Sequence, residues 1–234
     1  MSTPAITTAG AEAAAGRLVP LTGLRGAIAR SMGQGWQIPR VAHSVEVDVS
    51  RFEALRQALA GEGHKPSLTV LLLRAVALTL REHPGLNALM RDKAVELMPD
   101  INLGVAVSLD DGLMVPVIRE ADTLTLPALS AELRRLAEGA RAGTLSAGSY
   151  QRATFTVSNL GMTAIDRFSP IINPPQVAIL GITRVVDRAV VRNGQIVVAP
   201  MLGLHLVFDH RAIDGHPAAV FLGELARRIE TAAL

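Results

Sequence analysis

The 234-residue sequence has no cysteine and few aromatic residues. Without cysteine there can be no disulfide, no thiolate nucleophile and no cysteine-ligated metal, a composition that fits an intracellular protein. Aromatic residues make up 3% of the chain, and the basic residues are scattered among acids, with a net charge of +2. Because a nucleic-acid groove needs clustered cations and aromatic platforms, we expect no nucleic-acid partner.

The sequence also lacks a long apolar run and a visible signal peptide. The longest run, residues 68–80, is 13 residues long and contains Arg74. A membrane-spanning helix needs about 20 apolar residues, so this run predicts a buried core helix instead. We therefore expect no membrane partner and a cytoplasmic location.

The remaining composition indicates one compact domain. Hydrophobic residues make up 49% of the chain and charged residues 19%. Residues 1–17 are rich in Thr, Ala and Gly without periodic apolar spacing, which is typical of a flexible tether. We expect a tether over residues 1–17 and a folded domain over residues 18–234.

Helical and strand patterns alternate along that domain. A Ser-x-x-Glu capping box predicts a helix over residues 50–60, beginning with Ser50 as its cap, and Ser67 is expected to cap the next helix. Two hairpins are expected, at residues 110–112 and at Asn193-Gly194. Further helices are predicted over residues 23–32 and 126–136 and after Pro217, and further strands over residues 41–49, 152–158, 177–182 and 202–208. This mixture predicts an α/β fold with a mixed sheet.

The sequence His-x-x-x-Asp-Gly at residues 210–215 is the most suggestive motif. His210 follows an apolar strand, and Asp214 lies in the turn before the last helix. A neutral imidazole can act as a base near pH 7 if one nitrogen is free and the other is held by an acceptor. The structural alternative is that Asp214 only caps the last helix and His210 packs beside it.

Ser158 ends a strand whose hydroxyl residues alternate with apolar ones. Taken alone, it reads as a serine that caps a loop. A Ser/His/Asp hydrolase could be assembled from Ser158, His210 and Asp214, but the Gly-x-Ser-x-Gly elbow that exposes such a nucleophile is missing. A metal site from His205, His210, Asp214 and His216 is disfavoured because no helical i, i+4 histidine pair exists. No Gly-x-Gly-x-x-Gly fingerprint supports a dinucleotide fold.

Several segments together resemble the catalytic domain of the dihydrolipoyl acyltransferases of 2-oxoacid dehydrogenase complexes. The resemblance runs from about residue 18 to the C-terminus. The segments that carry it are residues 111–119 (Asp-Gly-Leu-Met-Val-Pro-Val-Ile-Arg), 154–161 (Thr-Phe-Thr-Val-Ser-Asn-Leu-Gly), 171–181 (Ile-Ile-Asn-Pro-Pro-Gln-Val-Ala-Ile-Leu-Gly) and 209–215 (Asp-His-Arg-Ala-Ile-Asp-Gly).

The resemblance implies a two-layer α/β sandwich similar to chloramphenicol acetyltransferase, working as a trimer, with trimers often assembled into cubic or dodecahedral cores. Coenzyme A and dihydrolipoamide would enter a channel between subunits. The resemblance implies that His210 is the general base and that Ser158, from the neighbouring subunit, stabilises the oxyanion. It also makes Asp214 the orienting carboxylate, paired with Arg25, with Gly215 and Asn159 supporting the site and no metal involved.

Two departures from the family pattern matter. Family members usually carry a lipoyl domain ahead of this one, whereas about 17 residues precede the match here, so either the sequence is part of a longer protein or a separate protein supplies the lipoyl group. His216 replaces a usually small residue, which would either alter the channel or cap the last helix, and we expect the cap. We interpret the chain as an acyl-coenzyme A:dihydrolipoamide acyltransferase that works with other complex components. The alternatives are an acyltransferase of the same fold with a non-lipoyl acceptor, and a non-catalytic scaffold.

Overall fold

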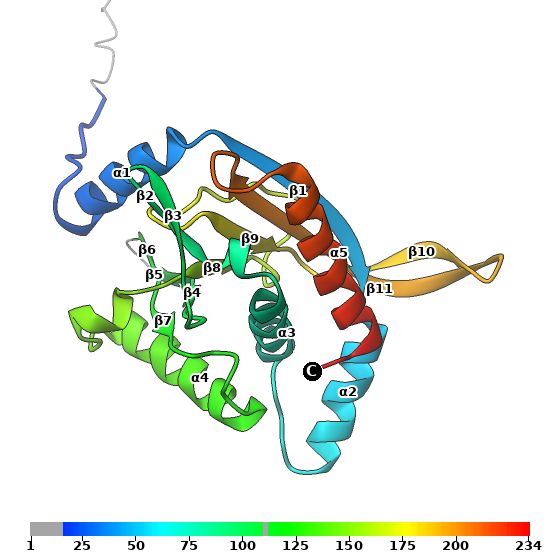
Figure 1. The fold of residues 1–234 in the computed structure, drawn as a ribbon. Helices are drawn as coiled ribbons and strands as arrows, with labels where there is room; N and C mark the ends of the chain where they lie inside the picture. Colours follow the sequence, from blue (N-terminus) through cyan, green and yellow to red (C-terminus); the bar gives the residue numbers. More distant parts are fainter. Residues whose placement is uncertain (1–15, 110–111) are drawn as a thin grey trace, which may run out of the picture.

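The computed structural model describes residues 16–109 and 112–234 (Figure 1). The chain forms one mixed sheet with helices packed against it. The predicted boundary between a tether and the domain at residues 17 and 18 stays a prediction, because most of that segment lies outside the described residues. Asp110 and Asp111 of the predicted hairpin turn also lie outside them.

The main sheet has the strand order β1-β11-β9-β8-β4-β7, and β10 also pairs with β11. Strands β8 and β9 are parallel, as are β4 and β8, and the other pairs are antiparallel. This confirms the predicted mixed sheet. The strands of this sheet are β1 (Arg40–Asp48), β4 (Leu103–Val105), β7 (Val117–Ile118), β8 (Phe155–Asn159), β9 (Ala178–Ile182), β10 (Val186–Arg192) and β11 (Gln195–Asp209).

Two short hairpins accompany the main sheet. One consists of β2 (Ala88–Arg91) and β3 (Ala94–Leu97), and the other of β5 (Val107–Leu109) and β6 (Gly112–Met114). The second hairpin confirms the one predicted around residues 110–112. The strands that precede and follow this hairpin, β4 and β7, pair with each other in the main sheet. Each of the two predicted apolar runs therefore divides into two strands, the first into β4 and β5 and the second into β6 and β7.

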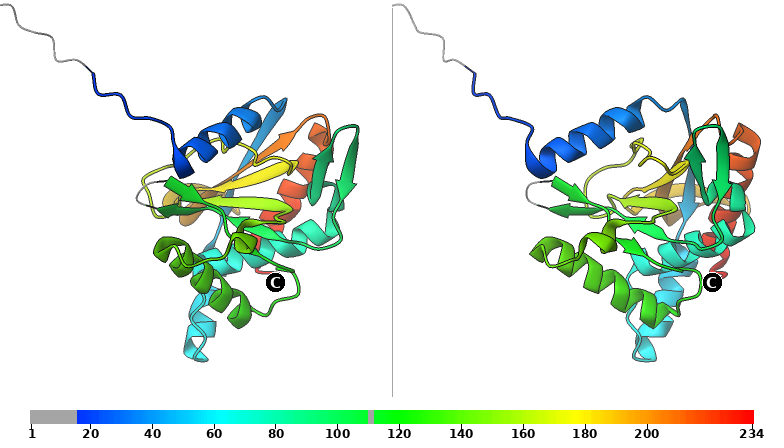
Figure 2. Two further views of the ribbon diagram at one scale, coloured as in Figure 1. Left: turned by 90° about the vertical axis from the view of Figure 1, so that its left-hand side faces the viewer. Right: turned by 60° about the vertical axis from the view of Figure 1, so that its left-hand side comes forward.

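The core lies between one face of the sheet and four helices, which confirms a two-layer arrangement. Helix α3 is the most buried of them, as its unbroken apolar run predicts. The view in Figure 2 shows α4 on one side of the strands and α1 on the other. The helices are α1 (Gly23–Trp36), α2 (Ser50–Gly61), α3 (Leu68–Glu82), α4 (Leu126–Ala142) and α5 (Gly215–Thr231), with short 3-10 turns η1 (Pro84–Leu86) and η2 (Ala147–Tyr150). Within the part of the chain that the structure describes, no helix is both long and apolar enough to cross a bilayer.

The ends of the helices can be compared with the caps that the sequence predicts. Ser67 accepts a hydrogen bond from the backbone N–H of Val70, as predicted. The capping box at Ser50 was wrong, because Ser50 is the first residue of α2 rather than its cap, and its N–H donates to Asp48 Oδ1 at 2.8 Å. Helix α4 ends at Gly143, which has the left-handed φ of 66° that glycine tolerates best.

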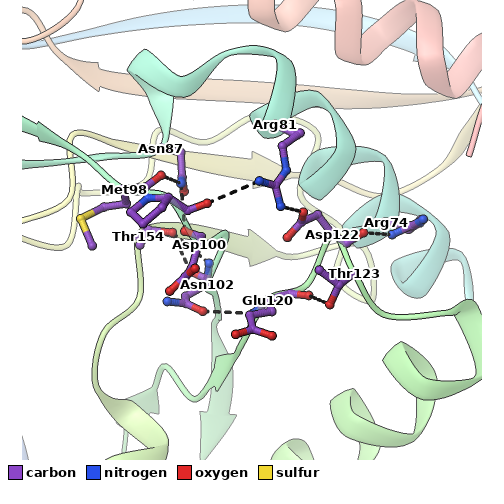
Figure 3. Close-up of polar contacts among 11 residues, drawn as sticks. Arg74, Arg81, Asn87, Met98, Asp100, Asn102, Glu120, Asp122, Thr123 and Thr154 are labelled. Atoms are coloured by element: carbon purple, nitrogen blue, oxygen red, sulfur yellow. Dashed lines mark hydrogen bonds and ion pairs between the residues drawn. The ribbon is translucent and has the colours of Figure 1, made fainter.

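A buried polar network holds the start of β8 against the segment that leads into β4 (Figure 3). Thr154 Oγ1 accepts from the Asn102 N–H at 3.0 Å and donates to the Asn102 carbonyl at 3.2 Å. Asn102 Oδ1 in turn accepts from the Glu120 N–H at 3.0 Å. The network therefore ties together three segments that are distant in sequence, and it fixes where β8 begins.

Replacing Thr154 with Val should lower the free energy of unfolding by about 1–3 kcal/mol, because the isosteric side chain leaves the buried Asn102 N–H without its acceptor. Denaturant unfolding of the two proteins measures the difference. Thr123→Val is the matched control, because Thr123 Oγ1 donates to the Glu120 carbonyl on the surface. Loss of this exposed hydrogen bond should change the free energy of unfolding by less than about 0.5 kcal/mol. Equal effects of the two substitutions would contradict a special role for the buried network.

Candidate active site

His210 lies immediately after β11, at the end of the main sheet. Its backbone N–H donates to the Pro39 carbonyl at 2.8 Å, which fixes the turn against the residue before β1. Its ring centroid is 5.9 Å from that of Phe208, and its side chain is exposed. The imidazole has no hydrogen bond to any residue in 16–109 or 112–234. One chain therefore presents His210 from a rigid strand end with both ring nitrogens open.

Asp209 holds the turn that carries His210. Its carboxylate is fully buried and accepts from the Arg211 N–H at 3.0 Å and from the Arg211 guanidinium, which raises the pKa of Arg211. Its backbone carbonyl accepts from the N–H groups of Ala212 and Ile213, and its own N–H donates to Val177. No sequence pattern predicted a role for Asp209 or Arg211. The sequence shows that an acid precedes the histidine, but only the fold shows that this acid is buried.

The residues predicted to support His210 lie at the start of α5, for Asp214 and Gly215, and on α1, for Arg25. Asp214 occupies the cap position of α5 but makes no side-chain cap hydrogen bond, and its predicted pairing with Arg25 stays a prediction. The Arg25 guanidinium lies near the start of β6, since a Cβ atom built on Gly112 would be 3.9 Å from it. His216 is the second residue of α5, so the expectation that it caps this helix is wrong. A Cβ built on Gly215 would lie 3.8 Å from the His43 ring.

Ser158 projects from the face of β8 that points away from the core. Its neighbours Phe155 and Val157 belong to the core, so the alternating residues Thr156 and Ser158 point away from it. Thr156 Oγ1 donates to the buried Gln176 side chain at 2.6 Å. Gln176 was missed as a site-supporting residue, although it lies in a segment that carries the family resemblance.

Asn159 fixes the loop that follows Ser158. Its side-chain amide donates to Thr69 Oγ1 at 3.0 Å, and its Oδ1 accepts from the Gly161 N–H at 2.7 Å. A Cβ at Gly161 would lie 2.9 Å from Asn159 Oδ1, so this turn needs glycine. The contacts are those expected of a residue that positions the end of β8 rather than one that reacts.

The strand register shows that Ser158 and His210 do not meet within one chain. Ser158 pairs with Gly181 of β9, which pairs with His205 of β11. The path from Ser158 to His210 thus crosses two strand spacings and runs five residues on from His205, a separation of about 19 Å between α-carbons. Within one chain the two side chains are therefore far apart.

His205 lies in the same transverse row as Ser158, on the face opposite Leu204 and Leu206, as the alternation predicts. Its Nδ1 is 2.8 Å from Ser44 Oγ. Burial lowers the pKa of His205, against a smaller raising effect from the Asp166 carbonyl. The described residues contain no cluster of three potential metal ligands.

Three comparisons with known proteins agree on one family. Residues 13–234 match the family model described as the 2-oxoacid dehydrogenases acyltransferase catalytic domain. The chain is 40% identical over 211 residues to the lipoamide acyltransferase component of the branched-chain alpha-keto acid dehydrogenase complex of Pseudomonas aeruginosa. This alignment covers 87% of the chain and 49% of that protein. The chain spans about half the length of the curated relatives it matches.

Solved structures superpose over nearly the whole chain. The cubic core of the pyruvate dehydrogenase multienzyme complex has a TM-score of 0.89 at 34% identity, covering 98% of both chains. The dihydrolipoamide acetyltransferase of Azotobacter vinelandii, studied for the catalytic roles of a serine, a histidine and an asparagine, has a TM-score of 0.88 at 35% identity, covering 92% of both. A chloramphenicol acetyltransferase, at 17% identity and covering 86% of this chain and 92% of its own, shares the fold with a TM-score of 0.52.

Proposed function

The chain belongs to the 2-oxoacid dehydrogenase acyltransferase family, and from that premise we propose that it transfers acyl groups between the thiols of dihydrolipoamide and coenzyme A. The observation that carries the proposal is a match of spacing. In the Azotobacter enzyme the serine precedes the histidine by 52 positions and the asparagine follows it by four. Ser158, His210 and Asp214 have the same separations, with aspartate in place of asparagine.

His210 acts in this proposal as the general base. A thiol of pKa about 8.5 is mostly protonated at neutral pH, so it needs a base to become the attacking thiolate. As the S–H proton moves to the imidazole, the sulfur bonds to the thioester carbonyl carbon. The tetrahedral intermediate then expels the other thiolate, which takes the proton back from the imidazolium. No acyl-enzyme forms.

Ser158 stabilises the oxyanion of that intermediate. Its hydroxyl lies at the end of β8 on the face that points away from the core, held in place by the contacts of Thr156 and Asn159 on either side. A preorganised hydroxyl donor aimed at a developing oxyanion contributes roughly 3–4 kcal/mol to transition-state binding. Asp214, Arg25 and Gly215 would orient His210 in the assembled protein, where Asp214 can meet groups from a second copy.

The active unit of the proposal is a trimer with one site at each subunit boundary, because about 19 Å separates the α-carbons of Ser158 and His210 within one chain. A larger cubic or dodecahedral core built from such trimers is part of the proposal, and the likeness to a cubic core supports it. The proposal also includes a lipoyl group supplied in trans by a separate lipoylated protein. It further includes contacts with the other 2-oxoacid dehydrogenase components. The cytoplasmic location stays a prediction.

The proposal is tested by incubating the protein with acetyl-coenzyme A and free dihydrolipoamide, on material whose mass is measured by light scattering. We expect S-acetyl-dihydrolipoamide to form with repeated turnover and no acylated protein in the mass spectrum. Acylation of a small amine or alcohol, with dihydrolipoamide inert, would favour the non-lipoyl acyltransferase. Normal assembly without any turnover would favour the scaffold.

A further inference from the structure

A pocket of about 510 Å³ lies on the face of the sheet that points away from the core, between β1, β11 and the segment over residues 166–169. Its floor includes Ser44, Gly203 and His205, and its wall is the segment from Asp166 to Ser169. The pairs Ser44–His205, His205–Gly181 and Gly181–Ser158 put all four residues in one row across β1, β11, β9 and β8. His205 is therefore two strand spacings, about 10 Å, from Ser158.

Phe168 covers the part of this row between Ser158 and the pocket. A Cβ on Gly181 would lie 2.8 Å from the Phe168 ring, so the ring occupies the space that a side chain would take. The centroids of Phe168 and His205 are 6.1 Å apart. The ring thus forms an apolar surface that leads from Ser158 toward His205, suitable for the methylene groups of an acyl chain.

His205 gives the pocket an open hydrogen-bonding position. It is 6% exposed, and its Nε2 is buried with no hydrogen-bond partner in the described chain. A buried polar nitrogen without a partner costs about 1–3 kcal/mol. A ligand that bonds to this nitrogen would offset that cost.

The charges around the pocket favour an anion. Glu46 pairs with Arg188 at 3.2 Å, and Asp166 pairs with Arg184 at 2.7 Å, so each acid already has a cation. Arg167 lines the pocket and acts electrostatically on both Asp166 and His205. With His205 neutral, three arginines against two acids leave one positive charge, on the side where Arg167 lies.

We propose that this pocket is the acyl subsite of the reaction and selects a short acyl group that ends in a carboxylate. The inference rests on the proposed function, since it takes Ser158 as the position of the thioester carbonyl. Arg167 pairs with the distal carboxylate, His205 donates a hydrogen bond from Nε2, and Phe168 packs on the methylenes. A four-carbon dicarboxylic acyl group, with a hydrogen bond at each end, matches the distance of about 10 Å between Ser158 and His205.

The test compares succinyl-coenzyme A with butyryl-coenzyme A, which has the same four carbons and no carboxylate, using free dihydrolipoamide as acceptor. We expect kcat/KM to be at least about 10-fold higher for the succinyl donor, the discrimination that a charge-assisted contact supports. Arg167→Gln should remove most of this preference, leaving the butyryl rate within about twofold, and Arg167→Glu should reverse it.

Arg141→Gln is the matched control, because Arg141 is an exposed arginine on α4 outside the pocket. It should leave the ratio of the two donors unchanged. A butyryl preference in the parent protein, or an equal loss for both donors in Arg167→Gln, would overturn the acyl subsite while the transfer itself stands. Failure to acylate dihydrolipoamide from either donor and from acetyl-coenzyme A would instead overturn the proposed function, and the subsite with it.

Discussion

Replacing His210 with Ala is expected to lower kcat for acyl transfer by at least about 100-fold, because the attacking thiol loses its general base. The affinity for coenzyme A should change little, since the imidazole acts on the thiol proton and not on the rest of the ligand. The fold should also survive, because the side chain is exposed and the turn is held by Asp209 and by the backbone of His210. Steady-state rates, equilibrium binding and thermal unfolding of the two proteins measure these three quantities.

His64→Ala is the matched control for that experiment. His64 is an exposed histidine in the connection between α2 and α3, far along the chain from β11. Its removal should leave kcat within about twofold of the parent, as is usual for a surface substitution away from the site. Near-normal turnover in His210→Ala would exclude His210 as the base.

Local patterns predicted most of the elements because the physics behind them is local. The leucine spacing before Gly143 marks one face of α4, and Asn193-Gly194 is the turn that the β10–β11 hairpin requires, with φ of 51° and 78°. The same reasoning failed at Ser50, where the Asp48 side chain binds the Ser50 N–H and the helix starts one residue earlier than a capping box allows. The acceptor that binds the Ser50 N–H lies two residues earlier, outside the Ser-x-x-Glu pattern, so the pattern alone cannot predict where this helix starts.

The site was predictable only in its reactive residues. The His-x-x-x-Asp-Gly and Thr-x-Ser-Asn segments identified His210 and Ser158, but their distance depends on the register of β8, β9 and β11. Register follows from packing between segments far apart in sequence, so no local pattern reveals it. The same holds for the transverse row that joins Ser44, His205 and Ser158, and for the burial of Asp209, which depends on strands on either side of it.

The separation of about 19 Å between Ser158 and His210 within one chain leads to the second prediction with a large expected effect. His210→Ala and Ser158→Ala proteins should each be nearly inactive alone, the second by roughly 100- to 1000-fold. A boundary that joins His210 of a Ser158→Ala subunit to Ser158 of a His210→Ala subunit contains both intact groups. The two inactive proteins should therefore complement each other once their subunits exchange.

The expected recovery can be calculated from the geometry of a cyclic trimer. Each mixed trimer has one complete boundary out of three, so random exchange of equal amounts should restore about one quarter of the parent activity. The measurement is turnover before and after mild dissociation and reassembly, with exchange followed by mass-labelled subunits. Each variant treated alone is the control and should stay inactive. Proven exchange without recovery would mean that both groups act within one subunit, a result incompatible with the register of β8, β9 and β11.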